Sequence, residues 1–305
     1  MLDYRKFSGS REFRKKILSS LSWIPDSLML RIQYFLQTGK KLNLKNPDTF
    51  NEKMQWYKLY YHNPEMLRCT DKIEIKKYLE EKGYGEFLIP TIAVYKKTED
   101  FDFKALPEKF VIKTSDGSGA NEVMVIRSKN EISEEYLYKK LQEWWKAPKK
   151  KKHEAREWAY DNGYPRRIIV EELLEEPEKN DLDDYKFYCF NGKYRFLQWH
   201  KDRHTAHRAG HYDENLNFLP DVRVDTYPSF DKAENLPQNF NKMIEVAESV
   251  ANAFPFVRVD LYNINGKIYI GELTFYPASG YFNYQPEYVD KWLGSLFTEP
   301  LSSYH

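Results

Sequence analysis

The chain has 305 residues, of which 41% are apolar and 30% are charged, and this length allows two ordinary domains or one large composite. Its 24 tyrosines, 19 phenylalanines and 7 tryptophans argue against disorder, because disordered chains are poor in aromatic residues. The 47 basic and 46 acidic residues leave a net charge of +1, so the chain as a whole has no general attraction to nucleic acid or to an anionic membrane.

Two cysteines, Cys69 and Cys189, are too few for a disulfide framework or a four-thiolate metal site. The basic N-terminal segment has no continuous apolar core of the signal-peptide kind, and no apolar run approaches membrane-spanning length. We therefore expect a cytoplasmic protein with no stable membrane insertion.

Residues 1–66 are predicted to form an N-terminal helical region. Two segments between residues 10 and 42 carry apolar residues at three- and four-residue spacing, and Gly39 can end the second helix. A third helix is expected after Thr49, because Glu52 three residues later completes a capping-box pattern.

Residues 67–176 are predicted to form a small subdomain. A helix over residues 71–85 is followed by two strand-like runs over residues 109–129, which a glycine-containing loop joins. A helix over residues 133–146 then leads to an apolar strand over residues 168–176.

Residues 177–305 are predicted to form a larger subdomain. A hairpin on an Asn-Gly turn is expected over residues 185–202, and residues 203–240 are expected to be irregular. An amphipathic helix over residues 239–254 precedes a second hairpin over residues 258–280. Helices followed by hairpins indicate an α+β fold, not a regular βαβ alternation.

The second hairpin, "RVDLYNINGKIYIGELTFYPASG", carries charges where apolar residues would stabilise more. A two-residue turn at Asn265-Gly266 would place Asp260 and Glu272 on opposite faces. A three-residue turn with Gly266 in a bulge would oppose Arg258 to Glu272 and Asp260 to Ile270. We predict this second register, because it separates a polar face from an apolar one: Arg258, Asp260, Glu272 and Thr274 against Val257, Val259, Leu261 and Leu273.

Two carboxylates and an arginine on one face of a sheet suit a magnesium site. Mg²⁺ prefers oxygen ligands, usually one or two carboxylates with phosphate oxygens, and an adjacent arginine can hold the phosphate. The alternative is an exposed ion pair between Arg258 and Glu272 on a solvated face.

The segment "FVIKTSDGSGANEV" can bind phosphate. Lys113 ends an apolar strand, and the small residues that follow can bring backbone N–H groups close to phosphate oxygens: Ser115, Gly117, Ser118 and Gly119. It is not a Walker A motif, and a plain hairpin loop is the alternative. Similarly, the strand "IIVEELLEE" could offer backbone hydrogen bonds to a flat base, or could be a core strand that meets solvent.

In this order, the three segments resemble the ATP-grasp enzymes, and most closely the TupA-like (teichuronopeptide-biosynthesis-like) branch of bacterial polysaccharide clusters. The resemblance extends over about residues 45–290 and also includes "FNEKMQWYKLY", "TDKIEIKKYL", "DDYKFYCFNGK" and "KDR". It implies an α+β ATP-grasp fold, in which two α+β subdomains enclose the nucleotide.

The resemblance also implies an ATP site. Lys72 and Lys113 would reach the phosphates, while the loop 115–119 closes over them. Asp184 would bind the ribose, and three residues would border the adenine: Glu171, Glu172 and Leu173.

For the metal, the resemblance implies Asp260 and Glu272 as Mg²⁺ ligands and Arg258 on the transferred phosphate. Many ATP-grasp enzymes have Asn two residues after the glutamate, where this chain has Thr274, whose hydroxyl is a weaker ligand. Further cationic groups near the phosphates or the acceptor would be Lys186 and Arg203.

The implied activity is Mg–ATP-dependent ligation of a carboxylate and an amine through an acyl phosphate. The substrates expected are a uronic acid or similar saccharide carboxylate and an amine or amino acid, with no nucleic acid partner. Alternatives are an ATP-grasp kinase, an inactive nucleotide-binding module, and a nucleotide-sugar glycosyltransferase that uses the Asp-x-Asp pattern of Asp181 and Asp183.

Two other polar segments could also have a function. Four histidines follow at spacings of four, three and four and could bind zinc on a helix, although Gly210 indicates a loop: His200, His204, His207 and His211. In a loop, His204 or Arg208 could contact an anionic substrate. The run Lys149–Lys152 is interpreted as a solvated face, or as a contact for a polyanionic substrate.

Overall fold

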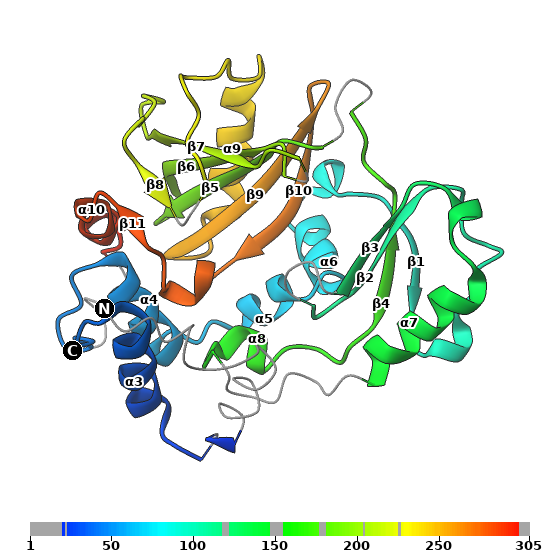
Figure 1. The fold of residues 1–305 in the computed structure, drawn as a ribbon, viewed down its shortest axis with the longest axis horizontal. Coiled ribbons are helices and arrows are strands. Elements are labelled where there is room, and N and C mark those ends of the chain that lie inside the picture. The colour runs from blue at the N-terminus through cyan, green and yellow to red at the C-terminus, as the bar shows by residue number, and fades with distance from the viewer. Residues whose placement is uncertain are drawn as a thin grey trace.

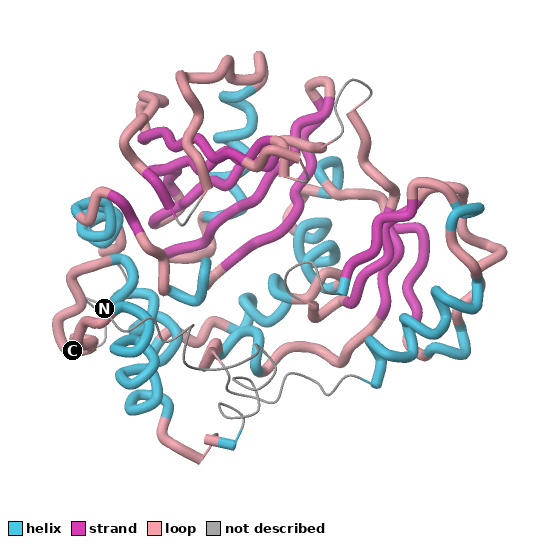
Figure 2. The backbone as a smooth tube through the Cα atoms, in the orientation of Figure 1, coloured by secondary structure: helices cyan, strands magenta, loops and turns pink. Residues whose placement is uncertain are grey.

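The computed structural model describes residues 20–21, 23–117, 122–146, 155–176, 181–203, 205–224 and 227–298. The two larger antiparallel sheets stand apart from one another, and the short helices α5 and α6 lie between them (Figures 1 and 2). This mixture of helices and antiparallel sheets confirms the predicted α+β class. The subdomain boundaries at residues 66 and 176 stay predictions.

Helices make up the N-terminal region; two have the predicted signals at one end, and the helix over residues 64–70 was not predicted. They are α3 (Asp26–Thr38), α4 (Phe50–Tyr60), α5 (Pro64–Thr70) and α6 (Glu74–Glu81). Gly39 ends α3 in a left-handed conformation with φ of 72°. The predicted capping box of Thr49 and Glu52 starts α4. Most of the helix predicted before residue 23 lies outside the described residues.

The four-stranded sheet has the order β1-β4-β2-β3, formed by β1 (Thr91–Tyr95), β2 (Phe110–Thr114), β3 (Val123–Ile126) and β4 (Ile168–Glu171). Leu137, Leu141 and Trp144 of helix α7 (Glu134–Lys146) pack with Ile112 and Val170 of the sheet. Because side chains alternate along a strand, the residues next to these, Lys113 and Glu171, face away from α7. Four short helices belong to the connections: η1 (Gly85–Phe87), η2 (Thr98–Asp100), η4 (Lys129–Glu131) and α8 (Trp158–Asp161).

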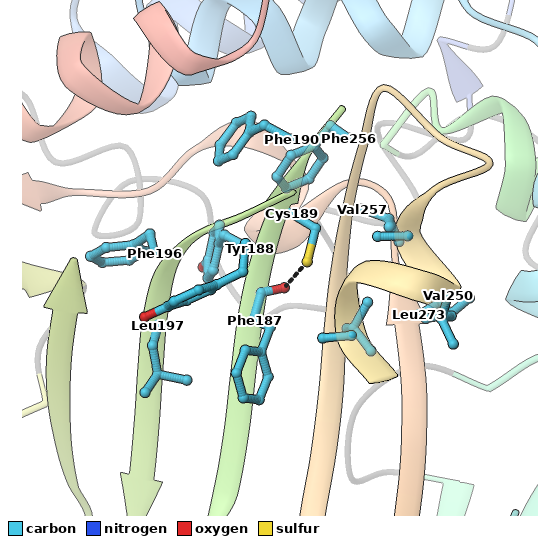
Figure 3. Close-up of a cluster of buried hydrophobic side chains, with 14 of the residues drawn as sticks. Phe187, Tyr188, Cys189, Phe190, Phe196, Leu197, Val250, Phe256, Val257 and Leu273 are labelled. Carbon is cyan, nitrogen blue, oxygen red and sulfur yellow. Dashed lines mark hydrogen bonds between the residues drawn. The ribbon is translucent and has the colours of Figure 1, made fainter. Parts of the chain in front are cut away.

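The five-stranded sheet has the order β10-β9-β5-β6-β7. Its strands are β5 (Asp184–Phe190), β6 (Lys193–Lys201), β7 (Arg208–Asp213), β9 (Phe256–Ile264) and β10 (Lys267–Thr274). Helix α9 (Phe240–Ala251) covers one face, where Val250 lies near Leu273 (Figure 3). Beyond the sheet lie β8 (Arg223–Val224), β11 (Tyr284–Gln285), η5 (Pro277–Gly280) and α10 (Tyr288–Leu296).

The prediction that residues 203–240 are irregular was wrong for β7. Gly210, which suggested a loop, lies inside this strand and pairs with Trp199 of β6. A Cβ atom at this position would lie 2.2 Å from the ring of Phe230. The glycine therefore marks a close approach of an aromatic side chain to a strand and does not mark a turn.

The predicted register of the β9–β10 hairpin was wrong at the turn. Asn265 and Gly266 form a two-residue turn with φ of 50° and 84°, so Ile264 pairs with Lys267. A bulge then shifts the register between Ile270 and Glu272.

Because of the bulge, the hairpin still has the polar face and the apolar face that the predicted register was chosen to explain. Asp260 pairs with Glu272, and Arg258 pairs with Thr274, so all four lie on one face of the sheet. Val259 pairs with Leu273 on the apolar face. The extra residue is Gly271, where a Cβ atom would lie 2.9 Å from the Tyr262 ring.

Candidate functional site

The polar face of the five-stranded sheet is centred on Asp260, which is 3% exposed. Arg258 donates to its carboxylate from Nε at 2.6 Å and from Nη2 at 2.7 Å, and Lys186 of the neighbouring strand donates from Nζ at 2.5 Å. Burial would raise the pKa of Asp260, but the charges of Arg258 and Lys186 outweigh it and lower the pKa to about 2. Asp260 is therefore an ionised carboxylate over the physiological pH range.

Glu272 stands beside this buried cluster but reaches solvent, with its side chain 56% exposed. Its Oε1 accepts from Arg258 Nη2 at 3.2 Å and from Thr274 Oγ1 at 3.1 Å. The side chain of Arg258 is only 11% exposed, so the alternative of an ion pair on a solvated face fits Glu272 but not Arg258. The hydroxyl of Thr274 orients the glutamate and also accepts from Arg258 at 3.0 Å.

Asp184 continues the polar face on β5. Its Oδ2 accepts from Lys186 at 2.7 Å and from Arg203 at 2.9 Å. Its Oδ1 is buried and has no hydrogen-bond partner. Because an unsatisfied buried acceptor costs free energy, this oxygen fits a ligand that brings a hydroxyl donor, as a ribose would.

On the four-stranded sheet, the buried carboxylate of Glu171 lies between two lysines. Lys113 forms an ion pair with one oxygen, and Lys76 approaches the other at 2.6 Å. Burial opposes ionisation of Glu171, but the two lysines outweigh it and hold its pKa below the ordinary value. Lys76 was missed from the sequence, because no local pattern distinguishes it from the neighbouring Lys77, which pairs with Glu74 instead.

The three residues predicted to border the adenine lie in two different environments. Glu171 holds the lysines, whereas the next two residues border an open cavity of about 470 Å³. The cavity is lined by Ile92, Ala105, Pro107, Lys109, Glu172 and Leu173. Contact of this segment with adenine stays a prediction.

Lys72 joins the predicted phosphate loop. Its backbone N–H donates to the carbonyl of Ser115 at 2.9 Å, and its Nζ donates to the carbonyl of Gly117. A Cβ atom at Gly117 would lie 2.2 Å from Thr114 Oγ1, so the chain needs glycine here. The other two predicted loop residues, Ser118 and Gly119, lie outside the described residues.

Charged groups of both sheets act on the ammonium group of Lys72. Burial, followed by the charge of Lys113, lowers the pKa of Lys72 to about 8, while Glu272 of the other sheet favours its charged form. A cavity of about 150 Å³ borders the same region, lined by Thr70, Asp71, Asp116 and residues 160–164. The site so defined has six basic side chains and four carboxylates, which leaves an excess of two positive charges. The basic residues are Lys72, Lys76, Lys113, Lys186, Arg203 and Arg258. The carboxylates belong to Glu171, Asp184, Asp260 and Glu272.

The loop after β10 begins three residues beyond Thr274 and packs against α4. Ala278, Ser279 and Gly280 follow one another with φ of 46°, 56° and 65°, a left-handed run that non-glycine residues seldom adopt. Buried Lys58 donates to the Ser279 carbonyl at 2.7 Å and to its hydroxyl at 2.9 Å. No sequence pattern singled out Lys58, because its role depends on a loop 221 residues away.

The described histidines of the predicted cluster, His200, His207 and His211, lie on strands or in a loop and not on a helix. His200 Nδ1 lies 2.7 Å from His207 Nε2, and burial lowers the pKa of His200 to about 2. His211 is buried on β7, and His204 lies outside the described residues. Among the described residues, no group of three or more His, Cys, Asp or Glu could hold a metal ion. The described histidines thus give no support to a zinc site.

The remaining alternatives have little structural support. Asp183 is buried and lies within 3.5 Å of the Tyr185 hydroxyl. The run Lys149–Lys152 lies outside the described residues. In the described part of the chain, no helix is both long and apolar enough to cross a bilayer.

The residues present fit Mg²⁺ and ATP. Asp260 and Glu272 pair across two strands and offer carboxylate oxygens, and Mg²⁺ needs only one or two protein carboxylates when phosphate oxygens supply the rest. The excess of basic side chains suits polyphosphate, and the unsatisfied Oδ1 of Asp184 suits a ribose hydroxyl.

Lysines and carboxylates that converge from two antiparallel sheets are the arrangement expected of the ATP-grasp fold. The family model described as "TupA-like ATPgrasp" matches residues 52–298, and the chain belongs to this family. The predicted family is thereby confirmed.

Solved ATP-grasp ligases are similar in part. D-alanine–D-alanine ligase from Bacillus anthracis, complexed with ATP, is 18% identical with a TM-score of 0.39, over 68% of this chain and 54% of the ligase. L-amino acid ligase from Bacillus licheniformis is 12% identical with a TM-score of 0.46, over 83% of this chain and 55% of the ligase. The chain thus spans little more than half the length of either enzyme. No protein with a curated description matches the sequence.

Proposed function

We propose that the protein is a Mg–ATP-dependent carboxylate–amine ligase. The observation that carries the proposal is the convergence of cations from both sheets beside the paired carboxylates of Asp260 and Glu272. Membership of the ATP-grasp family supports it. The substrate class proposed is a uronic acid or similar saccharide carboxylate with an amine or amino acid, as in assembly of a bacterial surface polysaccharide.

In the proposed reaction, an oxygen of the substrate carboxylate attacks the γ-phosphorus and ADP leaves. The amine then attacks the carbonyl carbon of the acyl phosphate, inorganic phosphate leaves, and the nitrogen loses a proton. No covalent bond to the protein forms, so positioning and charge neutralisation are its contribution.

The chain's own residues supply that contribution. Lys72 and Lys113 would hold phosphate oxygens, and Arg258, fixed by Asp260, would face the transferred group. Asp260 and Glu272 would hold Mg²⁺, which neutralises charge on the phosphates when bound. Because Arg258 is oriented before any ligand arrives, little reorganisation is needed during the reaction.

Two measurements test the proposal. Mg–ATP or a non-hydrolysable analogue should raise the melting temperature, because a ligand at about 100 times its Kd stabilises the native state by about 2.7 kcal/mol. ADP and phosphate should then appear only when a carboxylate and an amine are both present. ADP with a stable phosphorylated product would identify a kinase instead, and the absence of any nucleotide-dependent stabilisation would contradict the ATP site itself.

A further inference from the structure

Helix α3 carries a second apolar face that the rest of the described chain does not cover. Its inner face packs Leu30 and Tyr34 against Leu42, Leu44 and Trp56. The outer face has apolar residues at helical spacings of four, seven and eight, which place them on one stripe. These residues are Leu28, Ile32, Phe35 and Leu36, and their exposed fractions are 41–54%. Trp23, just before the helix, is 77% exposed. We call these five residues the outer stripe.

The outer stripe is concentrated and rigidly held. It contains five of the eleven large apolar side chains that are exposed in the described part of the chain. Buried Arg156 fixes the start of α3: its guanidinium donates to the carbonyl of Leu21 at 2.9 Å and of Ile24 at 3.2 Å and forms an ion pair with Asp26. Isolated exposed apolar residues are ordinary, but a contiguous stripe indicates an interaction surface.

The distribution of charge along the chain indicates what kind of partner the outer stripe binds. Residues 1–45 hold ten basic and three acidic residues, whereas residues 46–305 hold 37 basic and 43 acidic. The near-zero net charge of the chain thus hides an N-terminal excess of seven positive charges and a deficit of six elsewhere. Such asymmetry indicates an anionic partner for the N-terminal region.

We propose that the outer stripe and the basic residues among the first 45 positions of the sequence bind the surface of an anionic lipid bilayer. Apolar and aromatic side chains beside lysine and arginine are the combination that seats a helix in the lipid interface without crossing it. A second copy of the chain fits less well, because two faces with the same positive excess repel. Residues 1–19 also fit less well as a cover, since they hold six basic and two acidic residues themselves. Nucleic acid would match the charge but not the aliphatic stripe.

The experiment is co-sedimentation of the full chain with vesicles of phosphatidylcholine alone or mixed with phosphatidylglycerol. Binding should require phosphatidylglycerol at about 0.1 M NaCl and should fall sharply at about 0.5 M, because salt screens the attraction. Failure to bind the anionic vesicles at the lower salt concentration would overturn the proposal.

Two pairs of variants separate the apolar and the charged contributions. Leu28→Ser with Phe35→Ser should weaken binding about tenfold or more, whereas Tyr136→Ser with Tyr288→Ser, equally exposed on other helices, should not. Lys15→Glu with Lys16→Glu should weaken it by at least about 25-fold, whereas Lys96→Glu with Lys97→Glu, at two exposed positions just after β1, should have little effect.

Other outcomes would count against a lipid partner. Equal binding of all variants would overturn the proposal. So would a dimer, seen by size-exclusion chromatography without vesicle binding, that disappears with Leu28→Ser and Phe35→Ser. Because the lysine variants change no described contact, they keep the test valid even if the stripe variants fold poorly.

Discussion

The two sheets hold their charged groups in different ways. Around the five-stranded sheet, 43 of the described residues form one buried cluster, and Arg258, Asp260 and Lys186 lie fixed on its polar face. The four-stranded sheet has a cluster of ten described residues. The lysines beside it share one carboxylate, Glu171, and otherwise donate to neutral oxygens of Gly117, Ile89 and Thr91.

The difference indicates that the two sheets have different roles in the proposed reaction. Charges fixed by a large core and by each other suit a metal and a transferring phosphoryl group, where misplacement costs most rate. Lysines paired with a single carboxylate can exchange it for phosphate oxygens when a nucleotide arrives. The larger sheet should therefore lose both stability and activity when its charges change, and the smaller sheet should lose nucleotide affinity first.

The largest effect is expected for Asp260→Asn. The substitution leaves the buried charges of Arg258 and Lys186 without their shared partner, and breaking a buried ion pair from one side costs about 3–5 kcal/mol. Urea unfolding should show this loss, and ADP release should fall to background. A variant of wild-type stability would mean that Asp260 does not anchor the polar face.

Glu272→Gln is the matched control, because this carboxylate is half exposed. Its stability should stay within about 0.5 kcal/mol of wild type, while ADP release falls by about 100-fold or more through loss of a charged metal ligand. Equal losses of stability in Asp260→Asn and Glu272→Gln would remove the distinction between a buried anchor and an open ligand.

This pair of residues also shows how far the sequence could predict the site. Their types and spacing predicted a shared polar face, and the face exists. The register did not follow, because a bulge at Gly271 and a turn at Asn265-Gly266 compensate for one another. A glycine in a strand signals a bulge only weakly, and the neighbour that requires it, the Tyr262 ring, is visible only in three dimensions.

The smaller sheet is tested next by Lys113→Met, which keeps the length of the side chain and removes its charge. Loss of one phosphate contact should raise the KM for ATP by about 10- to 100-fold, measured by ADP release. The free energy of unfolding should fall less than in Asp260→Asn, because the buried carboxylate of Glu171 keeps Lys76 as a second ion partner. A stability loss as large as that of Asp260→Asn would contradict the contrast between the sheets.

The sequence indicated Lys113 and Lys72 but not what holds them. Glu171 was predicted at the adenine because it follows an apolar strand. Its partnership with Lys76 of α6 and Lys113 of β2 joins elements that are far apart in the sequence, which no local pattern encodes. Helices, caps and most strands were predictable because their signals are local, whereas ion pairs between distant segments were not.

A smaller effect, dependent on pH, is expected at Lys72. Its pKa of about 8 in the folded chain lies below the ordinary 10.5, so folding disfavours its protonated form. The resulting cost to stability is full below pH 8 and is relieved as the pH rises toward 10.5. Nucleotide affinity should change in the opposite direction, because the lysine loses the charge that holds phosphate.

The measurement is the KM for ATP between about pH 7 and pH 9, which should rise up to about tenfold as Lys72 loses its proton. Lys72→Arg is the control, since arginine stays charged over this range. Its profile should be flat, and a profile parallel to that of wild type would assign the titration to another group.

The smallest effect is expected for Thr274→Val, which tests whether the third position of the hairpin binds metal or only orients Glu272. The hydroxyl donates to Glu272 Oε1 and accepts from Arg258, and one such hydrogen bond contributes about 0.5–1.5 kcal/mol. If it only orients the glutamate, the Mg²⁺ concentration for half-maximal ADP release should rise about three- to tenfold. Thr274→Asn separates the two roles, because an amide carbonyl is a better Mg²⁺ ligand than a neutral hydroxyl. A lower Mg²⁺ requirement in Thr274→Asn, together with a rise of more than about 100-fold in Thr274→Val, would mean that the metal reaches this position directly.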